Sequence, residues 1–227
     1  MSELATKLRE ILVDMGAVLV GYGDVSDIVD GETKTGVAIA IPMERDMIRG
    51  IEEHVTMDYA QWYKDTNAKL DAAIKAGGEY LRSCGYKTRE LTMDNVVRDA
   101  NNCTELPLKS VAIRAGLGWI GKSAVLVTPQ YGGAIRMSAL LTDAPLPLNE
   151  PILESKCGGC TKCKDICPAN AITGKTWVKG IERAELVDQA ACAATAMANC
   201  RAAIGLDMTI CGKCFVYCPY TRKYIEG

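Results

Sequence analysis

The chain has 227 residues, a formal net charge of −2 and 48% hydrophobic residues, enough apolar material for one substantial core and a small additional module. It contains no run of about 18 apolar residues, so we expect a cytoplasmic protein without a membrane partner. Residues 1–150 carry 16 Lys plus Arg and 21 Asp plus Glu, whereas residues 151–227 carry 10 and 7. Neither part has the strongly basic character that is typical of a nucleic-acid surface.

The periodicity of apolar residues predicts a mixture of helices and strands in the first two thirds of the chain. In chain order, we expect a helix over 3–15, strands over 17–23 and 36–42, a helix over 57–84 that is interrupted or ended near Gly77-Gly78, a strand over 86–92, a helix over 106–116, and strands over 124–129 and 134–143. The proline-rich segment 143–151 then marks a boundary. We therefore predict an α/β domain over residues 1–150 and a second, cysteine-rich domain over residues 151–227.

The cysteines are concentrated in the second predicted domain. The sequence contains 11 cysteines, and nine of them fall between Cys157 and Cys218. In a reducing cytoplasm, such clustering points to metal ligation rather than to disulfides. Cys84 and Cys103 stand apart from the others, and we expect each of them to be a small, buried apolar side chain.

The nine clustered cysteines include two related runs. The run from Cys157 to Cys167 reads C-x2-C-x2-C-x3-C-P, the spacing with which bacterial ferredoxins bind iron–sulfur clusters. The run from Cys211 to Cys218 reads C-x2-C-x3-C-P and repeats the latter part of that pattern. Two such runs predict two [4Fe–4S] clusters. A pair of zinc sites is the alternative, but zinc ribbons need neither the two x3-Cys-Pro endings nor eight interlocking thiolates.

Each cluster needs four thiolates, and the last cysteine of each run is expected to bind the cluster of the other run. The first cluster would then be held by Cys157, Cys160, Cys163 and Cys218. The second cluster would be held by Cys167, Cys211, Cys214 and one further cysteine. Spacing leaves Cys192 and Cys200 as alternatives for this eighth ligand, because both lie in an alanine-rich segment that we expect to be helical.

The segment 116–123, Gly-Leu-Gly-Trp-Ile-Gly-Lys-Ser, contains two glycine patterns that are known from nucleotide-binding loops. Both patterns need a strand before the loop and a helix after it, so that helix N-terminal amides face the phosphates. Here a predicted helix precedes the glycines and a predicted strand follows them. We therefore expect no nucleoside triphosphate site, and we attribute the glycines to close approach of the backbone to a neighbour or to a flat cofactor.

Taken together, several motifs resemble the epoxyqueuosine reductase family and, more distantly, the reductive dehalogenases. These motifs are AGLGWIGKS at 115–123, LVTP, the YGG turn, LLTDAPLP, and the cysteine runs CGGCTKCKDICPANAI and CGKCFVYCPY. The resemblance covers about residues 55–222. It implies a nitroreductase-like α+β sandwich over residues 1–150 that holds a corrinoid (cobalamin), followed by a ferredoxin-like double [4Fe–4S] module that delivers electrons to it.

The resemblance also implies roles for individual residues. The family has a cysteine at the end of a D-x-x-x-C segment, which matches Asp188 to Cys192 and makes Cys192 rather than Cys200 the implied eighth ligand. The residues expected near the cofactor are Gly116, Gly118, Trp119, Gly121, Lys122, Ser123, Tyr131 and Arg136. FMN is the alternative cofactor, because nitroreductase-like domains more widely are flavin folds.

Two departures from the family pattern affect the expected chemistry. The family's candidate proton donor, an aspartate three residues before a proline, aligns with Thr104, which cannot act as a carboxylic acid does. We therefore take the neighbouring Glu105 as the candidate catalytic acid. The family also commonly continues into helical repeats that grip tRNA, whereas this chain ends nine residues after Cys218. Together with the near-neutral charge, this argues against tRNA as a partner.

These expectations combine into one functional hypothesis. A low-potential donor such as a ferredoxin or flavodoxin would reduce the two clusters. The clusters would then pass electrons to the corrinoid for the reduction of a small organic substrate. A non-catalytic electron carrier is the alternative. The single histidine, His54, lies among glutamates and is expected to be solvated, so we assign it no cofactor.

Overall fold

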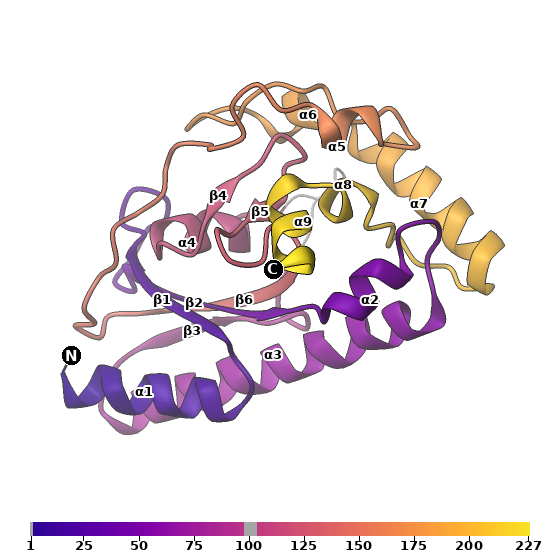
Figure 1. The fold of residues 1–227 in the computed structure, drawn as a ribbon. Helices are drawn as coiled ribbons and strands as arrows, with labels where there is room; N and C mark the ends of the chain where they lie inside the picture. Colours follow the sequence, from indigo (N-terminus) through magenta and orange to yellow (C-terminus); the bar gives the residue numbers. More distant parts are fainter. Residues whose placement is uncertain (1, 98–103) are drawn as a thin grey trace. The chain divides into compact units, whose positions relative to one another are not determined.

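The computed structural model describes residues 2–97 and 104–227, and Figure 1 shows their helices and strands. The chain divides into two compact units, each built from several segments. The first unit consists of Met1–Pro42, Asp65–Gly118 and Arg136–Ile152. The second unit consists of Met43–Lys64, Trp119–Ile135 and Leu153–Gly227. The chain passes from the first unit into the second for the last time after Ile152, close to the boundary expected at residue 150. The second unit, which contains the clustered cysteines, also includes the two earlier segments 43–64 and 119–135. Cys103 lies outside the described residues.

A four-stranded sheet in the order β1-β2-β6-β3 organises the first unit. Its strands are β1 (Leu19–Asp24), β2 (Thr35–Pro42), β3 (Thr88–Leu91) and β6 (Ile135–Thr142). The helices of this unit are α1 (Glu3–Asp14), α4 (Leu108–Arg114) and the greater part of α3 (Met57–Ser83). Strand β1 pairs with β2, and β3 with β6, in antiparallel register. The predicted mixture of helices and strands is therefore confirmed, with bounds that shift by a few residues.

The alternation of residues along β1 separates the two faces of the sheet. Val20 and Tyr22 belong to the hydrophobic core that includes α1 and α3. Because side chains alternate between faces along a strand, Gly21 and Gly23 lie on the opposite face, where α4 packs on β1 and β2. A Cβ atom on Gly21 would lie 2.1 Å from the carbonyl oxygen of Ala115. Only glycine allows the end of α4 to approach the strand this closely, which fixes the start of the glycine stretch on the sheet.

Helix α3 continues through Gly77 and Gly78, so the predicted interruption there is wrong. A Cβ atom on Gly77 would lie 3.1 Å from Leu12 Cδ2 and 3.3 Å from Leu8 Cδ1. Glycine therefore lets α1 pack closely against α3, and this packing outweighs the low helix propensity of glycine. Cys84 follows the end of α3 and is exposed, which contradicts the expectation that it is buried.

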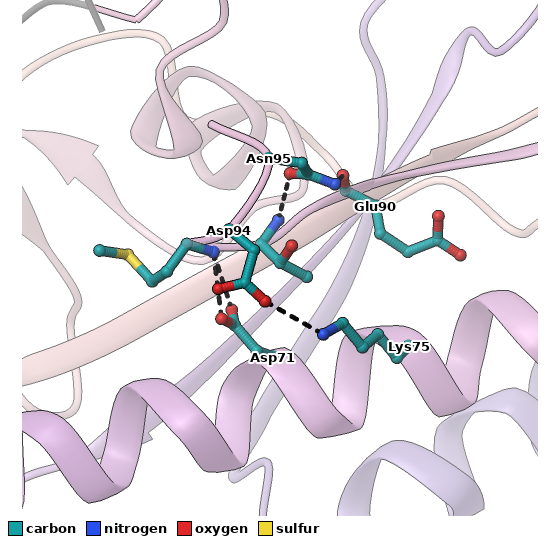
Figure 2. Close-up of polar contacts among 7 residues, drawn as sticks. Asp71, Lys75, Glu90, Asp94 and Asn95 are labelled. Carbon is teal, nitrogen blue, oxygen red and sulfur yellow. Dashed lines mark hydrogen bonds and ion pairs between the residues drawn. The ribbon is translucent and has the colours of Figure 1, made fainter. Parts of the chain in front are cut away.

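A small polar cluster joins α3 to the turn after β3 in the first unit, as Figure 2 shows. The carboxylate oxygens of Asp71 accept hydrogen bonds from the Met93 N–H at 3.0 and 3.3 Å. Lys75, one turn further along α3, forms an ion pair with Asp94 with an Nζ–Oδ2 distance of 3.3 Å. Desolvation raises the pKa of Asp71 above its ordinary value of 3.8, and the nearby Asp94 charge adds to this effect. These polar contacts hold the turn after β3 against helix α3.

The second unit is mainly helical. Its hairpin consists of β4 (Trp119–Ile120) and β5 (Leu126–Val127), which pair in antiparallel register. Besides the start of α3, its helices are α2 (Arg45–Gly50), α5 (Lys162–Asp165), α6 (Arg183–Leu186), α7 (Gln189–Ile204), α8 (Lys213–Val216) and α9 (Pro219–Glu226). Helix α2 packs against α9, and α5 packs against α8. The helical segment expected around Cys192 and Cys200 is α7.

The buried apolar residues of the second unit include the following two clusters, named from the part of the chain that the structure describes. The larger cluster gathers residues from α2, α3, α7, α8 and α9, and it includes Cys200. The smaller cluster combines Ala124 with residues of the segments 171–172 and 186–187. The cysteines that pack against this smaller cluster are Cys163, Cys167 and Cys214. Among the described residues, no helix has the length and apolar character needed to cross a bilayer.

Candidate metal centre

The first cysteine run occupies a turn followed by a short helix. The N–H of Cys160 donates to the carbonyl oxygen of Cys157 at 3.1 Å, which closes the turn. Cys163 lies in the single turn of α5, and Cys167 follows the end of that helix. Pro168 comes next, and a proline disfavours helical continuation at the residue before it. The first three cysteines therefore share one compact segment, while Cys167 lies beyond it.

The last cysteine of the chain joins this segment. Cys218 is the N-cap of α9, and Pro219 occupies the first helical position, where the missing N–H of proline breaks no helical hydrogen bond. Burial, followed by the electrostatic effect of three neighbouring cysteines, raises the pKa of the Cys163 thiol to about 11. Those neighbours are Cys157, Cys218 and Cys160. The four cysteines expected to hold the first cluster therefore lie together, although Cys218 is distant from the others in sequence.

These four cysteines line one cavity within the second unit, together with Cys214 of the second run. Gly121, Lys122 and Ser123 also line this cavity, so part of the glycine stretch lies beside the first cysteine group. Their role toward a further cofactor stays a prediction. Phe215 and Tyr220 also line the cavity. Neither aromatic residue is among the site residues expected from the sequence. Their positions next to Cys214 and two residues after Cys218 are the signal that could have identified them.

The start of α7 brings Cys192 to the second cysteine run. Asp188 is the N-cap of α7, and its carboxylate accepts a hydrogen bond from the Ala191 N–H at 2.9 Å. Cys192 therefore lies in the first turn, and its N–H donates to the Asp188 carbonyl oxygen at 3.1 Å. Partial desolvation, followed by the proximity of Cys167 and Cys211, raises the pKa of Cys192. The D-x-x-x-C spacing thus corresponds to a capped helix N-terminus that presents a cysteine.

Cys214 lies at the centre of the second group. Burial, followed by four neighbouring cysteines, raises the pKa of its thiol. In order of their effect, these neighbours are Cys211, Cys192, Cys163 and Cys167. Three of them are the cysteines that the resemblance groups with Cys214 around the second cluster. Cys200 is not among them, because its side chain is 0% exposed and packs in the larger apolar cluster.

The cysteines do not converge on a single point. Within residues 2–97 and 104–227, no group of three or more His, Cys, Asp or Glu side chains is arranged to hold one metal ion. In a [4Fe–4S] cluster each of the four thiolates binds a different iron, so the ligands surround a larger object than one ion. Thiolate is also the usual ligand of such clusters. The residues present therefore suit the cluster in both number and chemistry.

The order of elements around the glycine stretch differs from that of a nucleotide-binding loop. Helix α4 precedes the stretch, β4 lies within it and β5 follows it, so a helix comes before the glycines and a strand after them, as the sequence predicted. In the first unit, Gly116 has a φ of +71°, and a Cβ atom there would lie 2.8 Å from the carbonyl oxygen of Glu150. Gly118 is buried in the same unit. In the second unit, the Gly121 N–H donates to the Val125 carbonyl oxygen at 2.9 Å. These glycines serve close backbone packing within each unit.

Trp119 is fully buried in the second unit. Tyr220 packs edge-to-face on its ring with a centroid distance of 4.8 Å, and Lys156 Nζ lies 5.9 Å from the ring centroid. The indole N–H of Trp119 donates to no acceptor within the described part of the chain. A buried donor without an acceptor is unfavourable by about 1–3 kcal/mol. This N–H is therefore a donor that a bound group could satisfy.

Two further residues expected near a cofactor have partners within their own units. Tyr131, in the second unit, packs edge-to-face on Tyr224 with a centroid distance of 4.9 Å. Arg136, in the first unit, donates from Nε and Nη2 to Asn67 Oδ1 at 3.0 and 2.7 Å. Both contacts anchor the side chain, and the roles of Tyr131 and Arg136 toward a cofactor stay predictions.

The candidate acid lies at the surface of the first unit. The Glu105 side chain is 85% exposed, and its carboxylate pairs with Arg89 at 3.2 Å. A surface ion pair of this kind contributes little to stability and leaves the carboxylate accessible. The catalytic role of Glu105 stays a prediction. His54, expected to be solvated, is exposed.

Comparison with known proteins identifies the cysteine-rich segment. Residues 156–221 match the 4Fe-4S double cluster binding domain family. The match includes both cysteine runs and the whole of α7. The chain is also 42% identical over 113 residues to the epoxyqueuosine reductase of Bacillus cereus, which covers 50% of this chain and 28% of that protein. The resemblance inferred from the motifs is therefore confirmed, although the chain spans less than a third of this relative.

The fold is shared with two kinds of solved structure. An epoxyqueuosine reductase in complex with an epoxyqueuosine-modified tRNA-Tyr stem loop has a TM-score of 0.60 and 21% identity, covering 97% of this chain and 66% of that one. A reductive dehalogenase described in connection with B12-dependent dehalogenation has a TM-score of 0.63 and 18% identity, covering 96% and 33%. At these identities, the similarity shows the mixed α/β fold alone, and the double-cluster segment is shown by the family match over residues 156–221.

The expectation that argued against tRNA is wrong. The solved epoxyqueuosine reductase with a tRNA stem loop matches almost the whole of this chain. The expectation relied on the net charge and on the point where the sequence ends. Net charge does not report where individual lysines and arginines gather, and contacts with phosphate depend on such local groups. Neither observation therefore excludes tRNA.

Proposed function

We propose that this chain is an iron–sulfur reductase that holds two [4Fe–4S] clusters and passes their electrons to a further cofactor. The observation that carries the proposal is the convergence of cysteines from distant segments into two groups. The first group consists of Cys157, Cys160, Cys163 and Cys218. The second group consists of Cys167, Cys192, Cys211 and Cys214. Sequence similarity to epoxyqueuosine reductases supports a reductive activity.

The surroundings of the cysteines suit electron transfer. When bound, the clusters would supply single electrons at low potential. The smaller apolar cluster packs against Cys163, Cys167 and Cys214 and limits the access of water to them. Burial and nearby charges set the reduction potential of such a centre, so these packing residues would tune it. Cys200, packed among apolar side chains, has a structural role in this proposal.

We assign the further cofactor to residues 1–150 and the clusters to residues 151–227, with 43–64 and 119–135 packing in the cysteine-rich unit. The cofactor that we propose is a corrinoid held in a nitroreductase-like fold, and FMN is the alternative. The fold similarity to a dehalogenase described as B12-dependent supports the corrinoid. The indole N–H of Trp119, which has no acceptor among the described residues, is available to a group bound within the second unit.

The substrate to test first is an epoxyqueuosine-modified tRNA stem loop, because proteins similar to this chain are epoxyqueuosine reductases and one was solved with such an RNA. A small organic substrate is the second choice. In either case, Glu105 is the proposed proton donor, and it would have to release its ion pair with Arg89 to serve. A cytoplasmic location, in which clustered cysteines favour metal ligation over disulfides, belongs to the same proposal.

An anaerobic cofactor titration tests this function. Full-length protein with reconstituted clusters is titrated with cob(II)alamin and, separately, with FMN, while the visible spectrum is recorded. We expect a saturable spectral change with the corrinoid at micromolar concentration and none with FMN, followed by reduction of the stem loop when a chemical reductant is supplied. A change with FMN alone would replace the corrinoid by a flavin. Intact clusters with no binding of either cofactor would make the chain an electron carrier instead.

A further inference from the structure

Lys122 is a buried cation beside the first cysteine group. The residue is 7% exposed and lines the same cavity as Cys157 and Cys160. Its Nζ donates to the carbonyl oxygen of Cys160 at 3.1 Å. Lysine is almost never this buried unless its charge is paired, because the ammonium group loses its hydration. The location of Lys122 therefore needs an electrostatic reason.

The described residues do not supply a carboxylate for this charge. Among the described residues, the Lys122 ammonium group donates its hydrogen bond to the neutral carbonyl group of Cys160. Arg114, a second buried cation of the chain, shows the usual solution: its guanidinium forms a two-pronged ion pair with Asp27 at 2.8 and 2.7 Å. Arg114 thus has a carboxylate partner, whereas Lys122 has none among the described residues. This difference indicates that a negatively charged group bound in the cavity pairs with Lys122.

The proposed first cluster has the required charge. Four thiolates and the sulfides of a [4Fe–4S] core outweigh the positive charge of the irons, so the bound cluster is an anion, and reduction makes it one unit more negative. A fixed positive charge close by in a medium of low dielectric stabilises both forms, and it stabilises the reduced form more. A buried lysine at this cavity therefore favours reduction of the cluster.

We propose that Lys122 is the counter-charge of the cluster held by Cys157, Cys160, Cys163 and Cys218, and that it raises the reduction potential of this cluster. The hydrogen bond to Cys160 holds the ammonium group at the cavity wall. Lys122 thus acts on the cluster through its charge and does not bind an iron of the cluster. This inference rests on the cluster assignment of the proposed function.

The test compares four variants of the full chain. Lys122→Met removes both the charge and the donor, Lys122→Gln keeps a donor without the charge, and Lys122→Arg keeps the charge. Lys164→Met is the matched control, because Lys164 is adjacent to Cys163 but is exposed, so solvent screens its charge. Iron is determined in each protein, and the potentials of both clusters are measured by EPR-monitored reductive titration under anaerobic conditions.

We expect both neutral variants to lower the ratio of reduced to oxidised first cluster about tenfold at a fixed potential, equal to about 59 mV for one electron. Lys122→Arg and Lys164→Met should change this ratio less than about twofold on the same scale. If the neutral variants lose the first cluster and Lys122→Arg retains it, a required counter-charge is likewise supported.

Unchanged potentials in Lys122→Met and Lys122→Gln would overturn the inference while leaving the proposed function intact. Loss of the cluster in Lys122→Arg as well as in the neutral variants would also overturn it, because shape rather than charge would then be decisive. A wild-type chain that takes up no [4Fe–4S] cluster would overturn the proposed function, and the inference with it. Iron content in the wild type therefore separates the two failures.

Discussion

The backbone N–H of Gly133 donates a hydrogen bond to the buried hydroxyl of Thr221 at 3.0 Å. Gly132 also packs closely on this residue, because a Cβ atom on it would be 2.2 Å from Thr221 Oγ1. Thr221 follows Cys218 by three residues in the first turn of α9. The YGG turn, which the sequence analysis identified as a family motif, is thus a support for the helix that Cys218 caps.

Replacing Thr221 tests this support. Thr221→Val keeps the shape of the side chain but leaves the Gly133 N–H buried without an acceptor, which should cost about 1–3 kcal/mol of unfolding free energy. Denaturant unfolding of the reconstituted protein measures the change. Thr221→Ser retains the hydroxyl and is the matched control, expected to stay closer to the wild type. Equal stabilities of the valine and serine variants would show that the hydrogen bond contributes nothing.

The eighth cluster ligand can be identified by a pair of cysteine variants. Cys192→Ser should remove one cluster and reduce the iron content from about eight to about four per chain. Cys200→Ala should retain both clusters, because Cys200 is a buried apolar side chain. Iron analysis and EPR of the reduced proteins distinguish the two cases. A normal iron content in Cys192→Ser together with loss in Cys200→Ala would reverse the assignment.

The ion pair between Arg114 and Asp27 should be important for the first unit. Arg114 is buried and Asp27 is 40% exposed. Asp27→Ala would leave the guanidinium buried without its partner, which we expect to cost about 2–4 kcal/mol. The double variant Asp27→Ala/Arg114→Met should recover part of this loss, since it removes the unpaired charge. If the single variant is as stable as the wild type in denaturant unfolding, the pair is not structural.

The pKa of Asp71 predicts a small pH dependence of stability. Desolvation raises this pKa in the folded state, so between its ordinary value of 3.8 and the raised value the folded protein binds more protons than the unfolded chain. The free energy of unfolding should therefore fall as pH rises through this window. The effect should be below about 1 kcal/mol, because the carboxylate is partly exposed and solvent screens it.

Asp71→Asn tests the sign of this effect. The amide stays neutral at every pH and can still accept the hydrogen bond from the Met93 N–H. Urea unfolding at a series of pH values should therefore show a flatter profile in the variant than in the wild type. Stability that rises with pH more steeply in the wild type than in Asp71→Asn through the window would contradict the raised pKa.

Local patterns made much of the fold predictable. The amphipathic spacing around Leu8 and Leu12 and the apolar run of β2 were sufficient to locate α1 and its neighbouring strands. The cysteine spacings predicted seven members of two groups, the resemblance implied Cys192 as the eighth, and the structure brings these cysteines near one another. The helix, the strands and each cysteine run depend on residues close in sequence, which is why periodicity and spacing detect them.

Features that depend on distant contacts were not predictable. The continuation of α3 through Gly77 depends on Leu8 and Leu12, far away in the chain. The segments 43–64 and 119–135 join the cysteine-rich unit because their apolar residues pack with α8 and α9, and no local composition marks this. The burial of Lys122 beside Cys160 is likewise a tertiary contact.

The proposed function requires that eight cysteines of this chain hold two [4Fe–4S] clusters. Mössbauer spectroscopy of the full chain reconstituted with ⁵⁷Fe under anaerobic conditions, combined with iron determination, tests it most directly. We predict about eight irons per chain, all in the signals of [4Fe–4S] centres. Bound zinc in place of iron, or iron for a single cluster in the wild-type chain, would contradict the assignment of two [4Fe–4S] clusters to these cysteines.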